Sequence, residues 1–421
     1  MFRHILSIFI TVFFSTALLV AADWTAFRGP DGNGKSPDTG LLKKWNEGGP
    51  KLLWSIDFIG YGYSSVAVAD DRIYISGNVE REGKELTMIF CLDEEGKVIW
   101  EQDNGPAHAD VRRYKGTRGT PTIDDGRVYD VSALGEITCF DTKTGDKIWN
   151  RNVMKDYNAP QPEWLLGNSV LVEEDTVIFP LGGPKHIAVA LNKKTGETVW
   201  EAPPVADPAG AILGYTTPYA FDFDGIRVVT IMSDMTVEGI DVKTGKRLFS
   251  IPWRNSHRCH CTMPIYHNGH LFLTTGYNDS AAKLFRLAKN VDGTITTTEL
   301  WSEPRFNNHH GGVVLVGDHV YGTNHAGAWG SINFMTGEIG YLSRGGGKGS
   351  VHYADGLLYG LTEKDKTVLL IKPEPKEFVL LSQFELPNEA EGLSWAHPVV
   401  INGRLYLRHA QYLYCYDVRG E

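Results

Sequence analysis

The tripeptide Cys259-His260-Cys261 places two thiols and an imidazole within three residues. Thiolate and imidazole groups are suitable ligands for Cu(I) and Zn²⁺, so the tripeptide is a candidate metal site. His257 lies close by in the chain. A Cys-x-Cys pair does not complete a metal site alone, however, and needs ligands from other parts of the chain. The alternative interpretation is a pair of buried core cysteines.

A second set of chemically useful side chains occupies one position of a sequence repeat, which in the clearest copy lies two residues before Thr120, where the repeat unit begins. In an acidic protein, cations gathered at one place attract carboxylates, sulfated glycans or acidic peptides. Aromatic rings beside them would offer stacking surfaces. The alternative is that these are ordinary polar loop residues. The candidate ligand-binding set, including one residue from the next position inward, is Tyr63, Arg118, Tyr215, His310, Lys348, Trp395 and His397.

The repeat that must position these residues is clearest between Thr120 and Trp149. Short β-type runs at 122–123, 127–132, 136–141 and 147–149 are separated by two tight turns. Asp125-Gly126 is a hairpin signal, because glycine accepts a positive φ. Lys143 to Asp146 is the other turn and contains Gly145. Four antiparallel strands in about 35 residues are typical of one propeller blade.

The blade pattern recurs along most of the chain, and each copy ends in an aromatic residue after a turn. The last copy, from 395 to 417, has three strands and no closing aromatic, whereas an isolated strand at 52–54 has one. We therefore expect an all-β, eight-bladed β-propeller of four-stranded blades, with the N-terminal strand completing the C-terminal blade and closing the ring. Seven blades remain the alternative if one degenerate copy is an insertion. The closing aromatics are Trp54, Trp100, Trp149, Trp200, Phe249, Trp301, Tyr341 and Phe384.

Residues 1–22 have the features of a secretory signal: a short polar start, an apolar run and small residues before Asp23. The alternative is a membrane anchor, but the run is shorter than the ~20 residues of a typical span. No later segment reads as a span, so we expect a periplasmic or secreted protein. Residues 23–51 form a lead-in and 52–421 the propeller. Asp31-Gly32-Asn33-Gly34 lacks the distal glutamate of a calcium loop, which favours a flexible lead-in.

Net charge and cysteine content exclude two further classes of protein. The net charge of −10 repels phosphate backbones, so nucleic acid is not an expected partner. The chain has five cysteines, and this odd count in an exported protein leaves at least one thiol unpaired. A disulfide framework is therefore not expected.

The ending Asp141 to Trp149, D-x-x-T-G-x-x-x-W, resembles the tryptophan-docking motif of PQQ-like β-propeller repeats. The resemblance covers about 52–417, and with the segment Asp23 to Gly34 it is similar to exported PQQ-like propellers of planctomycete-type bacteria. Fold relatives include quinoprotein alcohol dehydrogenases and the propeller lipoprotein of the outer-membrane assembly machinery. In the dehydrogenases, adjacent cysteines form a disulfide beside the quinone, and Glu, Asn and Asp hold Ca²⁺. No Cys-Cys pair, calcium ligand or catalytic base can be transferred to this chain by motif.

The resemblance fixes a function less closely than a fold, because one fold hosts many functions. We expect a module that binds a small molecule, a glycan or an envelope protein at its central channel. The first alternative is a dehydrogenase of alcohols or sugars that uses PQQ with Ca²⁺. The second is an envelope assembly scaffold, although no lipid-anchor cysteine follows the signal segment.

Overall fold

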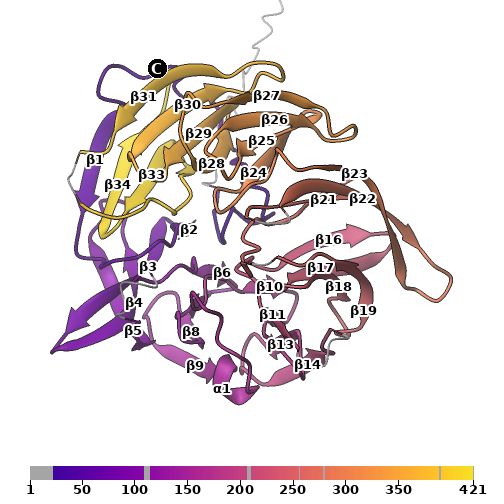
Figure 1. Ribbon diagram of the computed structural model, residues 1–421. Coiled ribbons are helices and arrows are strands. Elements are labelled where there is room, and N and C mark those ends of the chain that lie inside the picture. The colour runs from indigo at the N-terminus through magenta and orange to yellow at the C-terminus, as the bar shows by residue number, and fades with distance from the viewer. Residues whose placement is uncertain are drawn as a thin grey trace, which may run out of the picture.

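The computed structural model describes residues 22–108, 114–205, 210–255, 257–277, 280–387 and 390–420. The signal segment predicted at 1–22 therefore lies outside the described residues, apart from Ala22. In these ranges the strands form eight four-stranded sheets and one two-stranded sheet. The four-stranded sheets are arranged as blades around a centre (Figure 1). The eight-bladed, all-β propeller expected from the repeats is confirmed.

Each of the first seven blades is a simple antiparallel meander whose four strands follow one another along the chain. Blades 1 to 4 consist of β2 (Ala67–Ala69), β3 (Arg72–Arg81), β4 (Lys84–Leu92) and β5 (Val98–Pro106); β6 (Thr122–Asp124), β7 (Arg127–Val131), β8 (Glu136–Asp141) and β9 (Lys147–Asn152); β10 (Leu171–Glu173), β11 (Thr176–Pro180), β13 (Ala188–Asn192) and β14 (Thr198–Ala202); and β16 (Tyr219–Phe223), β17 (Ile226–Met232), β18 (Thr236–Asp241) and β19 (Arg247–Pro252).

Blades 5 to 7 repeat this order, and blade 8 has three such strands before the ring closes. They consist of β20 (Ile265–His267), β21 (His270–Thr275), β22 (Ala281–Lys289) and β23 (Ile295–Glu303); β24 (Val313–Val316), β25 (His319–Thr323), β26 (Trp329–Asn333) and β27 (Ile339–Ser343); β28 (Gly349–Ala354), β29 (Leu357–Thr362), β30 (Thr367–Lys372) and β31 (Val379–Glu385); and β32 (Val399–Ile401), β33 (Arg404–His409) and β34 (Tyr412–Asp417).

The fourth strand of blade 8 comes from the other end of the chain. β1 (Lys51–Ile56) pairs antiparallel with β34, with Trp54 opposite Cys415. In Figure 1 the indigo β1 lies beside the yellow β34. This pairing closes the ring, as the orphan strand in the sequence predicts. Short additions to the blades are β12 (Gly182–Gly183), β15 (Ala211–Ile212) and the one-turn helix α1 (Val153–Asp156). No helix among the described residues is long and apolar enough to cross a membrane.

The turn that precedes each tryptophan explains the Asp-x-x-Thr-Gly motif. Asp141 Oδ1 accepts hydrogen bonds from the backbone N–H groups of Lys143 (2.8 Å) and Thr144 (3.0 Å). Gly145 follows with φ of +78°, a conformation that a Cβ disfavours. The Trp100 ring of the preceding blade lies against this glycine, 2.7 Å from where a Cβ would be, and its Nε1 donates to the Thr142 carbonyl. The motif therefore joins neighbouring blades.

The same docking contact recurs around the ring. The indole N–H groups of Trp54, Trp149, Trp200 and Trp301 each donate to a backbone carbonyl in the turn of the next blade. The remaining aromatics lie on outermost strands at equivalent places: Phe249 on β19, Tyr341 on β27 and Phe384 on β31. Phe384 packs against Gly49 of the lead-in instead of a blade turn.

The lead-in is folded against the propeller, so the expectation that it is flexible is wrong. Trp24 is fully buried and exchanges two backbone hydrogen bonds with Val68 of blade 1. Further along, the Ser36 N–H donates to the Tyr353 carbonyl of blade 7. Leu41 forms a bridge with Arg419 beyond blade 8. Between these points Gly32 lies against Tyr219 of blade 4, so the segment also contacts the far side of the ring.

Candidate functional site

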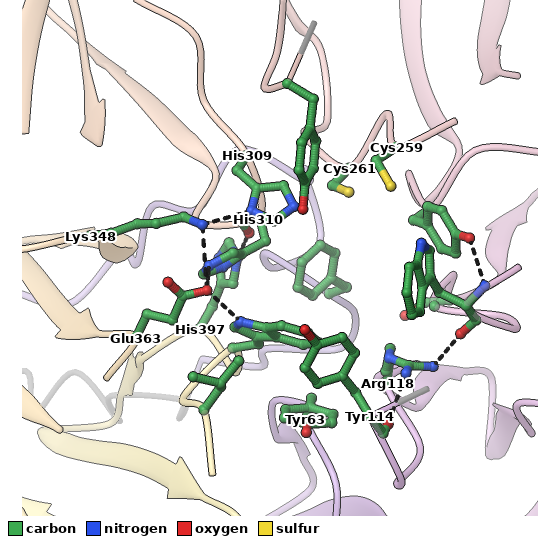
Figure 2. A pocket seen from close by; sticks show the side chains of 18 of the residues that line it. Tyr63, Tyr114, Arg118, Cys259, Cys261, His309, His310, Lys348, Glu363 and His397 are labelled. Carbon is green, nitrogen blue, oxygen red and sulfur yellow. Dashed lines mark hydrogen bonds and ion pairs between the residues drawn. The ribbon is translucent and has the colours of Figure 1, made fainter. Parts of the chain in front are cut away.

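A cavity of about 360 Å³ lies at the end of the central channel where the innermost strands begin. Because every blade starts its first strand at this face, the residues just before those strands converge here. The cavity is lined by all seven predicted channel-mouth residues, from six different blades: Tyr63, Arg118, Tyr215, His310, Lys348, Trp395 and His397 (Figure 2). Its volume is within the range of small-molecule sites.

The lead-in supplies the floor of this cavity. Phe27 lines it, and its ring lies edge-on to His397 at 5.0 Å between centroids. Arg28 is buried beneath, where its Nη2 donates to the Val313 carbonyl and its Nη1 to His397 Nδ1. His397 Nε2 in turn donates to the His310 carbonyl at 3.0 Å. These two partners fix His397 as a neutral tautomer, and burial together with the Arg28 charge lowers its pKa well below the usual value.

Arg118 presents its guanidinium at one wall of the cavity. Nη1 donates to the Trp164 carbonyl and Nη2 to the Tyr114 carbonyl, each at 2.8 Å, so two loops hold the side chain in place. The guanidinium lies 5.8 Å from the centroid of the Tyr63 ring. Burial lowers the pKa of Arg118, although the group remains a cation at neutral pH. This wall can bind a carboxylate or sulfate oxygen that enters the cavity.

Aromatic rings cover much of the remaining wall. Trp395 is central, with its ring 4.7 Å from that of Tyr63 and 4.8 Å from that of Tyr114. Tyr215 accepts a hydrogen bond from the Trp164 N–H through its hydroxyl, which fixes both loops. Such rings give flat, rigid contact surfaces at little entropic cost. The cavity therefore combines cations with stacking faces.

The opposite wall is a polar cluster centred on Glu363. Its Oε1 accepts from His310 Nε2 (3.0 Å), Trp395 Nε1 (2.9 Å) and Lys348 Nζ (3.4 Å). Burial raises the pKa of this carboxyl, but the contacts with His310 and Lys348 outweigh burial and hold the pKa well below its usual range. Lys348 Nζ also donates to His309 Nδ1 at 2.8 Å. Figure 2 shows four of these side chains pointing toward one another: His309, His310, Lys348 and Glu363.

Cys259, His260 and Cys261 are not brought together at one point. His260 is buried away from the cavity, where its Nε2 bonds to the Trp253 carbonyl, and burial lowers its pKa to about 4. The two cysteines line the cavity as free thiols. Burial raises the pKa of Cys259 to about 11 and that of Cys261 well above its usual value, so both stay protonated. Among the described residues, the group with metal-ligand spacing is instead His309, His310 and Glu363.

Two lining residues, Tyr277 and Glu363, and the neighbouring His325 lie outside the predicted set, because that set takes in only loops that enter the innermost strands. Tyr277, His325 and Glu363 follow the second strands β21, β25 and β29. Second strands run back toward the same face, so the residues after them also reach this end of the channel. A search one or two residues past each second strand would have found all three. Tyr277 and Glu363 line the cavity, and the Tyr277 ring lies 4.5 Å from that of His325.

The cavity does not fit the calcium–quinone centre of the dehydrogenases. Ca²⁺ takes six to eight oxygen ligands. Among the described lining residues, Glu363 is the carboxylate, and one of its oxygens already accepts three donors. Cys259 and Cys261 are separated by a residue whose side chain points elsewhere, and both are free. The residues present therefore do not support chemistry through that cofactor.

Comparison with known proteins shows which families share this architecture. A family model described as outer membrane protein assembly factor BamB matches residues 38–214 and 189–379. A curated relative of the same description from Yersinia pestis is 24% identical over 170 residues, which span 38% of each chain. The match therefore covers well under half of that relative's length.

Solved structures agree on the fold. BamB from Moraxella catarrhalis has a TM-score of 0.60 at 15% identity, covering 87% of this chain and 99% of its own. Quinohemoprotein alcohol dehydrogenase from Comamonas testosteroni has a TM-score of 0.64 at 12% identity, covering 95% of this chain and 81% of its own. At these identities the likeness concerns the fold alone. With the family model matching most of its length, the chain belongs to the PQQ-like repeat family of the outer membrane protein assembly factor BamB.

Proposed function

We propose that this chain is a binding protein whose channel cavity holds a small acidic saccharide, such as a uronate or a sulfated sugar. The observation that carries the proposal is the convergence of Arg118 and of the Trp395–Tyr63 ring pair on one cavity. Arg118 supplies a fixed positive charge at the cavity wall, which attracts a carboxylate or sulfate. The aromatic faces suit the apolar faces of sugar rings. Phe27 of the lead-in lines the same cavity and adds a further aromatic face.

The test compares one oligosaccharide with its own neutral form. A short oligouronate and the same sugar with its carboxylates reduced to alcohols are titrated into the protein by calorimetry, in the presence of a chelator. We expect the acid to bind at least about tenfold more tightly, since a charge-assisted hydrogen bond contributes about 1.5–3 kcal/mol. Equal affinities for the two forms would overturn the assignment of an acidic ligand.

Two substitutions locate the site. Arg118→Ala should remove the preference for the acid, and Trp395→Ala should weaken both sugars alike, because stacking does not depend on charge. Arg305→Ala is the matched control, since Arg305 is exposed and pairs with its neighbour Glu303. Circular dichroism and thermal melting establish that each variant is folded. Unchanged binding by Arg118→Ala in a folded protein would count against the channel cavity as the site.

The proposal includes export, with removal of residues 1–22. Trp24 supports this cleavage position, because it would be the second residue of the mature chain and its side chain is fully buried. The mature chain therefore begins within a few residues of a fixed point of the fold. The family description, which refers to outer membrane protein assembly, is consistent with an envelope location. Amino-terminal sequencing of the protein recovered from outside the cytoplasm tests it, with Asp23 as the expected first residue.

An envelope scaffold is the second candidate, favoured by the family description and by one surface feature. Consecutive blades expose apolar side chains on their outermost strands, and the exposed fractions of Ile99, Ile148 and Val199 are 44%, 43% and 49%. Exposed apolar strand edges are sites where a second protein can pair. A photo-crosslinker at Val199 should capture an envelope protein if this is the function. One at the exposed Thr296 of β23 serves as the control.

A further inference from the structure

Three potential ligands lie together where blades 6 and 7 meet at the channel mouth. His309 and His310 come from the loop before β24, and Glu363 directly follows β29. Their ligand atoms all lie within 4.8 Å of one another. Two imidazoles and one carboxylate form the donor set of several zinc sites in which a fourth position stays open. Nothing in the BamB-type match or the propeller fold accounts for this set.

The distance between the His310 and Glu363 ligand atoms suits a first-row divalent metal ion after a small movement of the two side chains. His310 Nε2 already lies 3.0 Å from Glu363 Oε1. Neighbouring ligands in a tetrahedral zinc site with bonds of about 2.0–2.2 Å are separated by roughly 3.3–3.5 Å. The two groups therefore need to move apart by only a few tenths of an ångström. Glu363 is buried and the two histidines are half-buried, so the donors are already desolvated in part.

A cation already occupies the space between the donors. Lys348 Nζ lies 2.8 Å from His309 Nδ1 and 3.4 Å from Glu363 Oε1. Because the ammonium donates to it, His309 Nδ1 carries a lone pair and no proton, which is the state that a metal requires. Lys348 also lines the cavity, and its flexible stem gives it room to swing into that open space. Its ammonium thus stands in for a metal ion.

A second observation at the cluster is independent of the lysine. The buried Nδ1 atoms of His310 and His325 have no hydrogen-bond partner among the described residues. The His325 ring lies 5.2 Å from that of His309, so a further imidazole borders the site. The bare Nδ1 of His310 can take up the ring proton when Nε2 binds a metal ion, because a neutral imidazole carries one proton on either nitrogen.

We propose that His309, His310 and Glu363 bind one divalent first-row transition metal ion, with Zn²⁺ the best match, in competition with the ammonium of Lys348. On binding, the His310 proton moves from Nε2 to Nδ1, and Lys348 swings into the cavity as a free cation. The open coordination position faces the cavity. The site does not depend on the acidic saccharide, because its donors all come from the protein.

The experiment is a Co²⁺ titration of tag-free protein that has first been stripped with a chelator, followed by competition with Zn²⁺. The readout is the visible absorption of protein-bound Co²⁺, with no saccharide present. We expect one ion per chain and displacement by one equivalent of Zn²⁺. Glu363→Gln and His309→Ala should each weaken binding by more than about tenfold. The control, His267→Ala, removes an exposed histidine at the β20–β21 turn and should change nothing.

Lys348→Met is the decisive variant, because it predicts a gain. Removing the competing cation should tighten Co²⁺ binding by about tenfold or more, and misfolding cannot mimic a gain of affinity. Binding by Lys348→Met no tighter than wild type, or unchanged binding by Glu363→Gln, would overturn the proposal. Failure of the metal-binding test would leave the saccharide proposal intact, since saccharide binding is measured in the presence of a chelator and depends on Arg118.

Discussion

Arg28 Nη1 lies 3.3 Å from Nδ1 of His397, so a residue from the N-terminal lead-in directly contacts the ring of channel-mouth residues. The contact spans nearly the whole chain. It joins a segment with no strand of its own to the blade that closes the propeller. The lead-in is therefore a structural part of the site: it lines the cavity through Phe27 and fixes the tautomer of a lining histidine.

Replacing Arg28 with methionine tests this role. The change leaves the Val313 carbonyl and His397 Nδ1 without their donor, and each buried unsatisfied group costs about 1–3 kcal/mol. Removal of a buried charge, whose pKa burial lowers to about 10, offsets part of this. We expect a net loss of about 2 kcal/mol in the free energy of unfolding. Amide exchange should become faster in 23–36, and unchanged exchange there would show that the lead-in is held by Trp24 alone.

The sequence determines the blades and the closure of the ring more fully than it determines the cavity at the channel mouth. The blade number and ring closure follow from local patterns: turn glycines such as Gly145, closing aromatics such as Trp100, and one orphan strand at β1. These signals are local because each blade is built from neighbouring residues. The ring position of Arg118 follows for the same reason, since it is fixed relative to a hairpin turn.

The rest of the site depends on contacts that no local pattern encodes. The path of the lead-in is set by contacts with blades that lie hundreds of residues away in the chain, such as those of Trp24 with His352 and Arg28 with Val313. The separation of His260 from Cys261 depends on which way each side chain points, because neighbours in an extended segment face opposite sides. Glu363 went unnoticed because its loop does not share the repeat's turn signature.

The tryptophan docking contact should carry much of the stability of each blade interface. Trp200 is buried, and its Nε1 donates to the Val242 carbonyl at 2.8 Å. Trp200→Ala should therefore lower the free energy of unfolding by about 3–5 kcal/mol, as for other large-to-small core changes. Trp200→Phe, which keeps a ring and loses the hydrogen bond, should cost less. Val199→Ala is the control, because that side chain is exposed, and its effect should stay within about 0.5 kcal/mol.

The turn glycine against which the Trp200 ring packs gives a second test of the same contact. Gly245 has φ of +70°, and a Cβ there would lie 2.9 Å from Trp200 ring atoms. Gly245→Ala should therefore destabilise the protein by about 1–3 kcal/mol through backbone strain and overlap. Thermal unfolding of the single and double variants forms a cycle. If the two effects simply add in Trp200→Ala/Gly245→Ala, the residues do not interact and the docking interpretation is wrong.

Removing the charge of Glu363 should tighten the binding of acidic ligands. In metal-free protein this carboxylate neutralises Lys348 at 3.4 Å, so Glu363→Gln leaves a more positive cavity. We expect the affinity for an oligouronate in chelator to rise by about three- to tenfold at low salt. The gain should shrink in high salt. Glu303→Gln is the control, because Glu303 pairs with the exposed Arg305 and does not line the cavity. A loss of affinity would show that Glu363 positions Trp395 rather than opposing the ligand's charge.

The buried carboxyl group of Asp130 should make the free energy of unfolding depend on pH. It is fully buried in blade 2, where it accepts hydrogen bonds from Ser76 and Asn104. Burial raises its pKa from the ordinary value of 3.8 to about 6, despite these hydrogen bonds. Between those two pH values the folded protein holds a proton that the unfolded chain has lost. Its contribution to the free energy of unfolding is therefore complete below about pH 4 and falls as pH rises toward 6.

Asp130→Asn isolates this contribution, because the amide keeps the shape without the charge. A shift of about two units corresponds to about 3 kcal/mol. The variant should gain about this amount relative to wild type between pH 4 and pH 7, measured by urea unfolding at each pH. The Asn amide can donate to Ser76 Oγ while its oxygen accepts from Asn104, so the network survives. A difference between variant and wild type that does not change with pH would mean that Asp130 is ionised in the folded protein throughout this range.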